Sequence, residues 1–430
     1  MGLFDIPRQL SMDAATKIIR RCEALGKISE EPGRLTRTFG SPAMRRTNEQ
    51  VAAWMREAGM RTRVDAIGNL IGHSGGENAG TKILLLGSHL DTVRDAGKFD
   101  GPLGVLLAIA CVEELRRKKI RLPYAVEVVG FCDEEGVRFR VPYLGSKALS
   151  GCFRTRDLRR TDASGVSLAE TIEDFGGDAA GMKSARIEPD RLLGYIEAHI
   201  EQGPVLEQAN LPVGVVSAIA GQTRARMTFT GRAGHAGTTP MHLRKDALCA
   251  AAEMVLAVET YARDTAGLVA TVGEISARPC AGNVIPGQVE LSLDVRHAKD
   301  AIRQSACKAL KQLALEIAAR RKLKLNFAIV HETAAVDCAK ELSALLERAV
   351  ECRQKKTIFL ESGAGHDAVV MADITPAAML FIRCKNGVSH HPDESVKTAD
   401  VRVALEVMID FLQLLAAQYL NSVGASERNL

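Results

Sequence analysis

The sequence predicts an α/β protein of two domains, one of which is inserted into the other. Strand-like and helical runs alternate through the first half of the chain, beginning with the apolar run from Ile83 to Ser88, and this alternation is typical of a largely parallel sheet. After Pro212 the order becomes strand, helix, two strands, helix, strand, which is the order of a ferredoxin-like sandwich. The length of 430 residues also exceeds what a single hydrophobic core usually serves.

The first domain is expected to be formed by both ends of the chain. Its early elements are a strand over 83–88, a helix starting near Gly104, a strand over 124–131 and a strand over 194–203 with a polar end. Alternating elements return from Val336 onward: a helix to about Arg353, a Gly-rich segment over 361–368, a strand over 379–384 and a helix over 401–420.

Between these two parts the pattern predicts an inserted α+β domain of roughly one hundred residues. Its expected elements are strands over 225–231, 268–275, 289–297 and 323–330, and helices over 245–263 and 300–320. The predicted boundaries therefore place residues 1–213 and 333–430 in the first domain and residues 214–332 in the inserted one.

The composition excludes several classes of protein. Hydrophobic residues make up 46% and charged residues 25% of the chain, which argues against extensive disorder. A formal charge of +4 implies no general attraction to nucleic acid or to an anionic membrane. The start of the chain lacks the features of a secretory signal, and the longest apolar stretch, Pro102 to Val112, is too short to span a bilayer. Ten cysteines without short disulfide spacing favour a reduced, cytoplasmic protein.

Polar residues follow the predicted strands at the points where parallel sheets place their sites. His89 and Asp91 come at the end of the first strand, and alone they would indicate no more than a satisfied turn. Asp100 follows in a Gly-Pro turn that enters a helix, and Glu134 and Glu135 follow the next strong strand. Zinc and similar ions bind His and carboxylate together, whereas magnesium and calcium prefer oxygen alone. The pattern therefore predicts a metal site.

The adjacent acids Glu134 and Glu135 can divide the work of such a site. Neighbouring residues in extended or turn structure point in different directions, so one can bind metal while the other faces a substrate. The alternative is a solvated acidic turn, and the apolar strand that leads into the pair disfavours it.

Two further histidines suit the same site: His199, in a mainly apolar strand, and His390, after the strand over 379–384. Three others lie in or at the end of predicted strands with no acidic partner apparent in the sequence, and they are interpreted as structural: His73, His297 and His331. Spacing leaves three undecided: His242, His366 and His391. The sequence contains no nucleophile elbow, P-loop or HExxH motif, and the glycines over 231–237 have the wrong spacing for a dinucleotide fingerprint.

Together these motifs make the chain resemble the M20 family of metallopeptidases, and within it the branch of allantoate amidohydrolases and N-carbamoyl-L-amino-acid hydrolases. The resemblance runs from about Ile18 to Phe411 and rests on GSHLDTV, FDGPLGV, DEEGVRF, YIEAHIEQGPVLE, GRAGHAGTTPM, GNVIPG and GVSHHPDE. It implies a zinc-peptidase-like catalytic domain with an inserted ferredoxin-like lid and dimerisation domain. It also implies a homodimer and two divalent ions per subunit, zinc or manganese, with cobalt or nickel as alternatives.

The resemblance assigns a role to each matching residue. His89 and His199 would bind one metal ion, Glu135 and His390 would bind the other, and Asp100 would bridge the two.

The same comparison makes Asp91 the acid that fixes the tautomer of His89, a support that metal-bound histidines generally need. Glu134 becomes the general acid and base, and His235 of one subunit would reach the active site of the other. Four residues would contact the substrate, the last two through its carboxylate: Gln202, Gln222, Asn283 and Arg296. A carboxylate suits the bidentate fork of an arginine.

The expected activity is hydrolysis of the ureido C–N bond of a small carboxylate. DEEGVRF followed by YLGSKALSG, and FIRCKNGVSHHPDES, resemble the allantoate enzymes, whereas the segment Arg140–Ser146 matches neither branch. Allantoate, giving ureidoglycine, ammonia and carbon dioxide, is the first candidate. An N-carbamoyl-L-amino acid or ureidopropionate is the alternative, followed by a dipeptide or acylated amino acid on the same scaffold. A noncatalytic metal-binding or ligand-sensing protein would not need Glu134 beside all five predicted ligands.

Overall fold

The computed structural model describes residues 12–76 and 80–426, and these residues form two compact units. The main unit comprises Met1–Ser217, Cys338–Leu360 and His366–Leu430, and the inserted unit comprises Ala218–Asp337 and Glu361–Gly365. Each unit has its own hydrophobic core. The boundaries predicted at 213/214 and 332/333 fall four and five residues before these limits, and Glu361–Gly365, predicted in the first domain, belong to the inserted unit instead. The first residues of the chain, on which the predicted lack of a signal depends, lie outside the described residues.

The main unit is built on a nine-stranded sheet of order β1-β2-β4-β3-β5-β16-β6-β14, with β15 paired to β6. The strands β4, β3, β5 and β16 at its centre are parallel, and antiparallel pairs flank them on both sides. The bounds of these strands are β1 Arg61–Val64, β2 Leu70–Ser74, β3 Ile83–His89, β4 Ala125–Phe131, β5 Leu192–Ile200, β6 Val213–Ile219, β14 Val336–Asp337, β15 Phe359–Ser362 and β16 Ala377–Ile382. The predicted largely parallel sheet is confirmed, whereas the flanking strands β1, β2, β6, β14 and β15 were not predicted.

One histidine of this sheet has a partner that the sequence did not reveal. His73 of β2 lies with its Nδ1 3.1 Å from Oε1 of Glu127 on β4. The prediction that His73 lacks acidic company was therefore wrong, because its partner comes from a strand that neighbours it in space and not in sequence.

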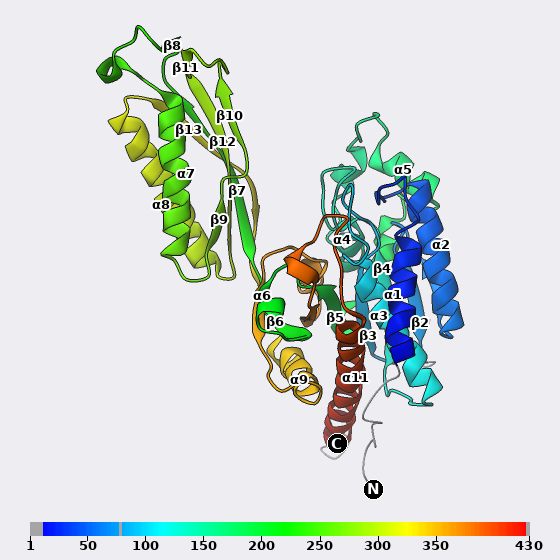
Figure 1. Ribbon diagram of the computed structural model, residues 1–430. Helices are drawn as coiled ribbons and strands as arrows, with labels where there is room; N and C mark the ends of the chain where they lie inside the picture. The colour runs from blue at the N-terminus through cyan, green and yellow to red at the C-terminus, as the bar shows by residue number, and fades with distance from the viewer. Residues whose placement is uncertain (1–11, 77–79, 427–430) are drawn as a thin grey trace. The chain divides into compact units, whose positions relative to one another are not determined.

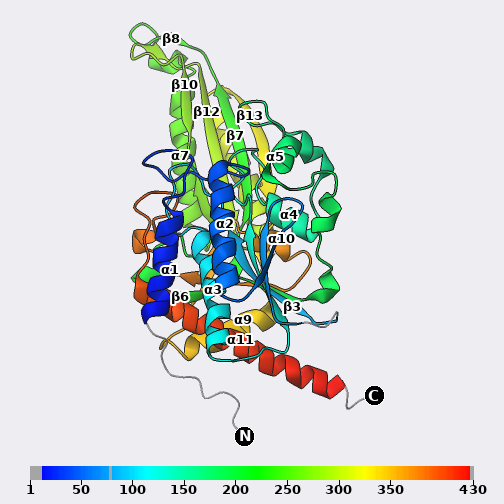
Figure 2. The ribbon, with the colours of Figure 1, turned by 90° about the vertical axis from the view of Figure 1, so that its right-hand side faces the viewer.

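Helices cover both faces of the sheet, as strand β5 shows (Figures 1 and 2). Its residues Ile196, Ala198 and Ile200 join the core that also contains the side chains of α3 and α11. The intervening Glu197 faces the other way and accepts the backbone N–H of Ala368 in α10. The helices of the main unit are α1 Met12–Leu25, α2 Pro42–Glu57, α3 Pro102–Arg117, α4 Leu144–Ser150, α5 Leu168–Phe175, α6 Val205–Gln208, α9 Lys340–Glu351, α10 Ala368–Met371 and α11 Thr398–Ser426.

Helix α11 is the one helix among the described residues that is long and apolar enough to cross a membrane. The residues concerned are Thr398–Ser422, and 67% of their most apolar window is buried inside the protein, as in the core helix of a globular fold. The most apolar long helix is therefore this last one, and not the predicted apolar stretch from Pro102 to Val112.

The inserted unit contains an antiparallel sheet of order β10-β12-β7-β13, with β9 also paired to β12. Helices α7 and α8 pack against it. The bounds are β7 Gly221–Thr230, β8 Gly234–His235, α7 Ala247–Arg263, β9 Val269–Thr271, β10 Ile275–Arg278, β11 Val284–Ile285, β12 Gln288–His297, α8 Asp300–Arg320 and β13 Lys324–Thr333. The first strand, β7, lies between the third and the last, which is the arrangement of the predicted ferredoxin-like sandwich.

Two predicted elements were wrong in detail. The strand expected over 268–275 is split into β9 and β10, because the chain between them turns and the N–H groups of Gly273 and Glu274 bond to the hydroxyl of Ser292. The helix expected from Val336 begins only at Lys340, because the chain first pairs with β6 as β14.

Strand β12 has one apolar and one polar face, as expected for a sheet covered by helices on one side. Val289, Leu291, Leu293 and Val295 are buried in the core that α7 and α8 share. The alternate residues, which form what we call the polar face of β12, are Glu290, Ser292, Asp294 and Arg296.

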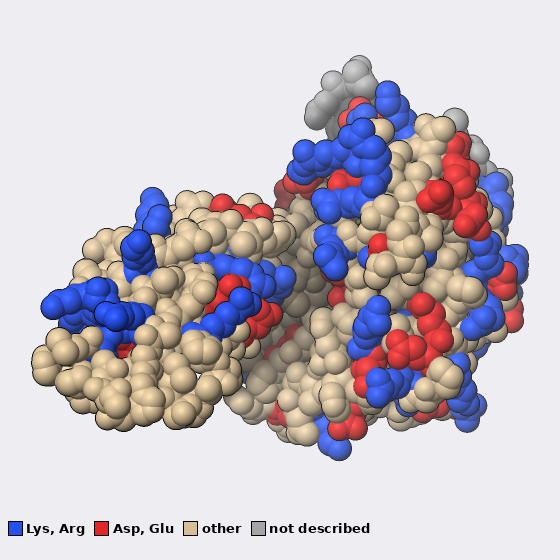
Figure 3. Space-filling view, turned by 90° about the horizontal axis from the view of Figure 1, so that it is seen from above, with Lys and Arg blue, Asp and Glu red and all other residues tan. Residues whose placement is uncertain are grey.

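Acidic and basic side chains lie among one another on the surface seen in Figure 3. Neither sign forms a continuous field over either unit in that view, in keeping with the small formal charge of +4.

Candidate metal-dependent active site

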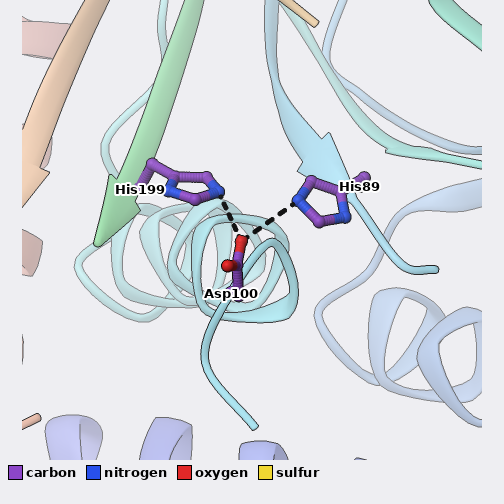
Figure 4. A group of neighbouring side chains, drawn as sticks. All are labelled: His89, Asp100 and His199. Atoms are coloured by element: carbon purple, nitrogen blue, oxygen red, sulfur yellow. Dashed lines mark ion pairs between the residues drawn. The ribbon is translucent and has the colours of Figure 1, made fainter. Parts of the chain in front are cut away.

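Three residues from three elements of the main unit converge at one point of the sheet (Figure 4). His89 ends β3, His199 lies near the end of β5, and Asp100 lies just before α3. Oδ1 of Asp100 is 3.5 Å from Nε2 of His89 and 3.1 Å from Nε2 of His199. One carboxylate oxygen therefore faces two imidazole nitrogens.

The other oxygen of Asp100 faces a second group. Nε2 of His390 lies 3.3 Å from Oδ2 of Asp100 and 3.3 Å from Oε1 of Glu135. The structure thus brings together all five residues that were predicted as ligands: His89, Asp100, Glu135, His199 and His390. Asp100 is common to both groups, as a bridging ligand must be.

Hydrogen bonds determine which nitrogen of each buried ring faces Asp100. Nδ1 of His89 is 3.0 Å from the carbonyl oxygen of Asp91, and Nδ1 of His199 is 2.9 Å from that of Ile200. A carbonyl can only accept, so each Nδ1 carries a proton, and in the neutral ring Nε2 presents its lone pair. The buried Nε2 of His199 also has no hydrogen-bond partner of normal geometry. Lone pairs that meet a carboxylate oxygen fit a cation placed among them, so the donor set suits a divalent metal.

The same contacts favour positive charge on the histidines. Burial alone would lower the pKa of His89, but hydrogen bonds to Asp100 and Asp91 outweigh it and raise the pKa well above its usual value. Hydrogen bonds to Asp100 and Glu135 raise the pKa of His390 to about 10. Burial would raise the pKa of Asp100, yet its histidine neighbours hold it well below the usual range. A cluster that attracts protons this strongly can exchange them for a metal ion.

Asp91 supports both parts of the site. Its carboxylate accepts the backbone N–H of Glu134 at 3.0 Å and that of Glu135 at 3.1 Å. The distance from its Oδ1 to Nδ1 of His89 is longer, 3.6 Å. The short contact that orients His89 is therefore made by the backbone carbonyl of Asp91, while its carboxylate orients the turn that carries the two acids.

Glu134 is a buried carboxyl beside this cluster. One of its oxygens lies within 4.8 Å of ligand atoms of both His89 and Glu135. Burial raises the pKa of Glu134 well above its usual value; the charge of His89 opposes this rise and the charge of Glu135 adds to it. A buried carboxyl with a raised pKa is suited to general acid and base catalysis.

The loop that carries Asp100 is held by residues that the sequence analysis missed. Glu394 accepts the backbone N–H groups of Phe99 at 2.7 Å and Asp100 at 3.1 Å, and the hydroxyl of Ser389 lies 2.5 Å from Oδ2 of Asp100. Their nearness to a predicted ligand in GVSHHPDE was the only available signal. Gln202 was predicted to contact substrate, but the structure directs its amide nitrogen to Oδ2 of Asp100 at 2.8 Å.

Two of the residues around Asp100 have a left-handed backbone. The φ angles of Gln202 and His390 are 56° and 57°, in a region that residues other than glycine seldom occupy. Such conformations cluster at functional sites, where the surrounding structure holds them in place.

A further buried group lies behind His199. Glu197 is fully buried and accepts hydrogen bonds from the hydroxyls of Ser88 and Tyr195 as well as from one backbone N–H. The ring centroid of His366 lies 4.5 Å from that of His199, and burial lowers the pKa of His366 well below its usual value. Spacing in the sequence did not assign a role to His366. Glu197 was not predicted as a site residue, because it lies within an otherwise apolar strand.

Glycines allow the strand ends and the start of α3 to approach this closely. Gly101 has a φ of 81°, and a Cβ there would lie 2.5 Å from the ring of His89. A Cβ on Gly104 would lie 2.1 Å from the carbonyl oxygen of Ala198. The motif FDGPLGV therefore needs its glycines to place Asp100 against the two histidines.

The predicted binding residues of the inserted unit form two separate pairs. Gln222 and Arg296 are cross-strand neighbours on β7 and β12. His235 of β8 pairs with Val284 of β11, directly after Asn283. Figure 1 shows β8 and β11 at one end of this unit, and most of β7, roughly 25 Å at about 3.3 Å per residue, separates the pairs. One chain therefore cannot bring both Asn283 and Arg296 to the same small carboxylate, so the prediction that they share one requires a second subunit.

Histidine and carboxylate groups at the carboxyl ends of parallel strands, next to a buried acid, define a metal-dependent hydrolase centre. The comparison with known proteins agrees. Residues 85–414 match the model of peptidase family M20/M25/M40, and the chain belongs to this family. The predicted family resemblance is confirmed.

Relatives of known name match almost the whole chain. A probable allantoate deiminase of Oryza sativa subsp. japonica is 40% identical over 92% of this chain and 87% of its own length. An N-carbamoyl-L-amino acid amidohydrolase of Geobacillus stearothermophilus is 40% identical over 93% of this chain and 98% of its own. The crystal structure of an amidase of the hydantoinase/carbamoylase family from Burkholderia multivorans has a TM-score of 0.87 at 30% identity, covering 94% of this chain and 98% of that one. The fold class is thereby confirmed as well.

Proposed function

We propose that this protein hydrolyses the ureido C–N bond of a small carboxylate, with allantoate as the first candidate and an N-carbamoyl-L-amino acid or ureidopropionate as the second. The observation that carries the proposal is the cluster around Asp100 with the buried Glu134 beside it. It provides metal ligands and a proton carrier within one site. Relatives named for both kinds of substrate match at the same 40% identity, so the choice between them depends on experiment.

We infer two divalent ions per subunit, because the ligand groups overlap at Asp100 alone. His89 and His199 face its Oδ1, whereas His390 with Glu135 faces its Oδ2. Mixed nitrogen and oxygen donors favour zinc or manganese, with cobalt or nickel as alternatives. When bound, such ions polarise a carbonyl and lower the pKa of water toward neutrality.

The residues of the chain would carry the proton through the reaction. Glu134 would take a proton from the water that attacks the ureido carbonyl carbon. It would return that proton to the leaving nitrogen as the C–N bond breaks. Allantoate would yield ureidoglycine, ammonia and carbon dioxide, and an N-carbamoyl amino acid would yield the free amino acid.

His235 is suited to stabilise the charge that develops on the carbonyl oxygen. Its Nδ1 accepts the backbone N–H of Gly237 at 3.1 Å, so in the neutral ring the proton is on Nε2. The side chain is exposed and can therefore donate from Nε2 to an oxyanion.

We further propose a homodimer in which His235 and Asn283 of one subunit serve the site of the other. The distance between these residues and the pair Gln222 and Arg296 supports this arrangement, because a single chain cannot unite the two pairs. Among the described residues, the inserted unit also carries most of the exposed large apolar side chains, which a subunit contact would cover: Met241, Leu243, Leu248, Leu256, Val269, Ile275, Leu315, Ile329 and Val330.

Mixed dimers test this arrangement. A Glu134→Gln subunit is combined with a subunit that carries one substitution in the inserted unit, either Asn283→Ala or Arg296→Ala. If Asn283 acts in the partner's site, the first mixture regains about a quarter of wild-type activity, since half of the molecules are mixed dimers with one complete site. The second mixture stays at the low activity of its parent homodimers. Recovery in both mixtures, or in neither, contradicts the assignment of the two pairs to different subunits.

The substrate is tested by steady-state kinetics of the metal-loaded enzyme. Allantoate, N-carbamoyl-L-amino acids, ureidopropionate and dipeptides are compared by kcat/KM. We expect the ureido substrates to exceed dipeptides, with one of them dominant. Turnover of dipeptides alone would reject the proposed substrate class while leaving the metal site intact.

We also propose that the protein works in the reducing cytoplasm. All ten cysteines are free in the structure, which supports this compartment. Fractionation of the source cells is the direct test.

A further inference from the structure

The carboxylate of Asp294 accepts hydrogen bonds from three side chains at one end of the inserted sheet. Its Oδ1 accepts from Nε of Arg296 at 2.9 Å, and its Oδ2 accepts from Nη2 of Arg296 at 3.0 Å. The same Oδ2 accepts from the amide of Gln222 at 2.7 Å and from Nε of Arg224 at 3.2 Å. Two residues predicted to bind substrate are therefore bound to one carboxylate, that of Asp294.

These bonds leave Arg296 with two N–H groups for a further acceptor. Its Nη1 donates to the carbonyl oxygen of Gly363 at 2.7 Å, so three of the five guanidinium N–H groups are engaged. The two that remain belong to the two terminal nitrogens, one on each. A guanidinium N–H of this kind can donate to a carboxylate. Asp294 thus restricts the rotation of the guanidinium and leaves both terminal nitrogens able to donate to a substrate.

Gln222 is oriented by the same contact. Its amide nitrogen faces Asp294, because a reversed amide would bring two oxygens together. Its carbonyl oxygen is therefore turned away from Asp294 and can accept a hydrogen bond from an N–H group. Arg296 can donate to a carboxylate, and the carbonyl oxygen of Gln222 beside it can accept an N–H. This pair matches a small molecule that carries a carboxylate and an amide nitrogen close together.

The net charge of Asp294, Arg296 and Arg224 also favours the binding of an anion. The partial burial of Asp294 would raise its pKa, but hydrogen bonds from Arg296 and Arg224 outweigh burial and lower it. Asp294 is therefore ionised at neutral pH and partly offsets two guanidinium charges. The local excess is positive, so a substrate carboxylate is attracted even though Arg296 already has an acidic partner.

We propose that Asp294 is a positioning residue that sets Arg296 and Gln222 for a substrate with adjacent carboxylate and amide N–H groups. This inference rests on the proposed function. Its advantage is that the side chains are ordered before the substrate arrives, which lowers the entropy cost of binding.

The test compares Asp294→Asn with the wild type on the preferred ureido substrate and on its uncharged carboxamide analogue. The variant should raise KM for the carboxylate about tenfold, the equivalent of losing one charge-assisted contact. KM for the carboxamide, which keeps only the contact to Gln222, should rise less, and kcat should be nearly unchanged. Glu290→Gln is the matched control, because Glu290 lies on the same polar face of β12 and pairs with Arg226. Its KM should equal that of the wild type.

A double substitution shows whether Asp294 acts through Arg296. In an Arg296→Ala background, Asp294→Asn should add less than about twofold to KM, because coupled residues are not additive. Full additivity, or an equal KM in Asp294→Asn and the wild type, overturns the inference. A fall of kcat on both substrates would show a merely structural role and overturns it as well. If the wild type itself does not prefer the carboxylate to the carboxamide, the proposed carboxylate recognition fails and the role of Asp294 fails with it.

Discussion

The predicted site residues of the two units differ in burial and in how closely they lie together. In the main unit the predicted ligands His89, Asp100 and His199 are almost fully buried, and backbone carbonyls or neighbouring acids orient them. In the inserted unit His235 and Asn283 are exposed and lie far from Arg296 along the sheet. On the proposed assignment, the metal ligands and the proton carrier are therefore preassembled within one chain, whereas the residues of the inserted unit would act only when a second subunit completes the site.

This difference follows from what each group must do. Buried charged groups are tolerated only when opposite charges and hydrogen bonds satisfy them, and this requirement produces the dense network around Asp100. Groups that receive a substrate must keep free donors and acceptors, so they remain at the surface. Substitutions of the ligands and of Glu134 should accordingly abolish chemistry, whereas those of Gln222 and Arg296 in the inserted unit should weaken binding.

The strongest test of this contrast is Glu134→Gln. The substitution keeps the shape of the side chain and removes its ability to take a proton, so kcat should fall by about three to four orders of magnitude. KM and the metal content should change little, because Glu134 is not among the proposed ligands. Kinetics and elemental analysis of the same preparation measure both quantities. Near-normal turnover would remove Glu134 from the reaction.

The neighbouring acid should behave differently. Glu135→Ala removes one ligand from the group that contains Asp100 and His390, so one of the two proposed ions should be lost and activity should fall at ordinary metal concentrations. Added metal should restore part of the activity, which it cannot do for Glu134→Gln. Retention of both ions after dialysis would contradict the division of labour between the adjacent acids.

A core substitution tests whether the two units are energetically separate. Phe229 is fully buried in the core of the inserted unit, and Phe229→Ala should destabilise that unit by about 3–5 kcal/mol. Hydrogen exchange should increase in β7 and β12, while the metal content of the main unit stays unchanged. The surface variant Glu290→Gln is the control. Loss of metal from Phe229→Ala would show that the main unit depends on the inserted core.

The sequence predicted the metal ligands because they follow apolar strands, and strand ends of a parallel sheet meet at one edge. The pattern before Ile83 was less informative, so β1, β2 and the first two helices were not predicted. Glu394 and Ser389 were missed because their partner Asp100 is almost three hundred residues away in the chain. No periodic pattern encodes such a contact, which arises only when β16 is placed beside β5.

Asp294 was missed for a different reason. It lies in an alternating strand, where an acidic residue on the polar face is ordinarily a solvated charge. Its importance comes from cross-strand register, which places Gln222 opposite Arg296 and Arg224 opposite Asp294. Register depends on how the whole sheet pairs, so it cannot be deduced from the strand alone.

The smallest predicted effect is the pH dependence of this carboxylate. The folded-state pKa of Asp294 lies below its usual value, so its contribution to stability is present above about pH 4, the usual pKa of an unfolded Asp, and is lost as the pH falls through the lower folded-state value. Asp294→Asn should therefore reduce the opening free energy of β7 and β12 by roughly 1 kcal/mol at pH 6, allowing for solvent screening. The difference from the wild type should shrink as the pH falls below about 4 and vanish only below the folded-state pKa. Hydrogen exchange corrected for intrinsic rates measures it, and a difference that persists unchanged at pH 3 would show that packing, not the ionised carboxylate, holds Arg296 in place.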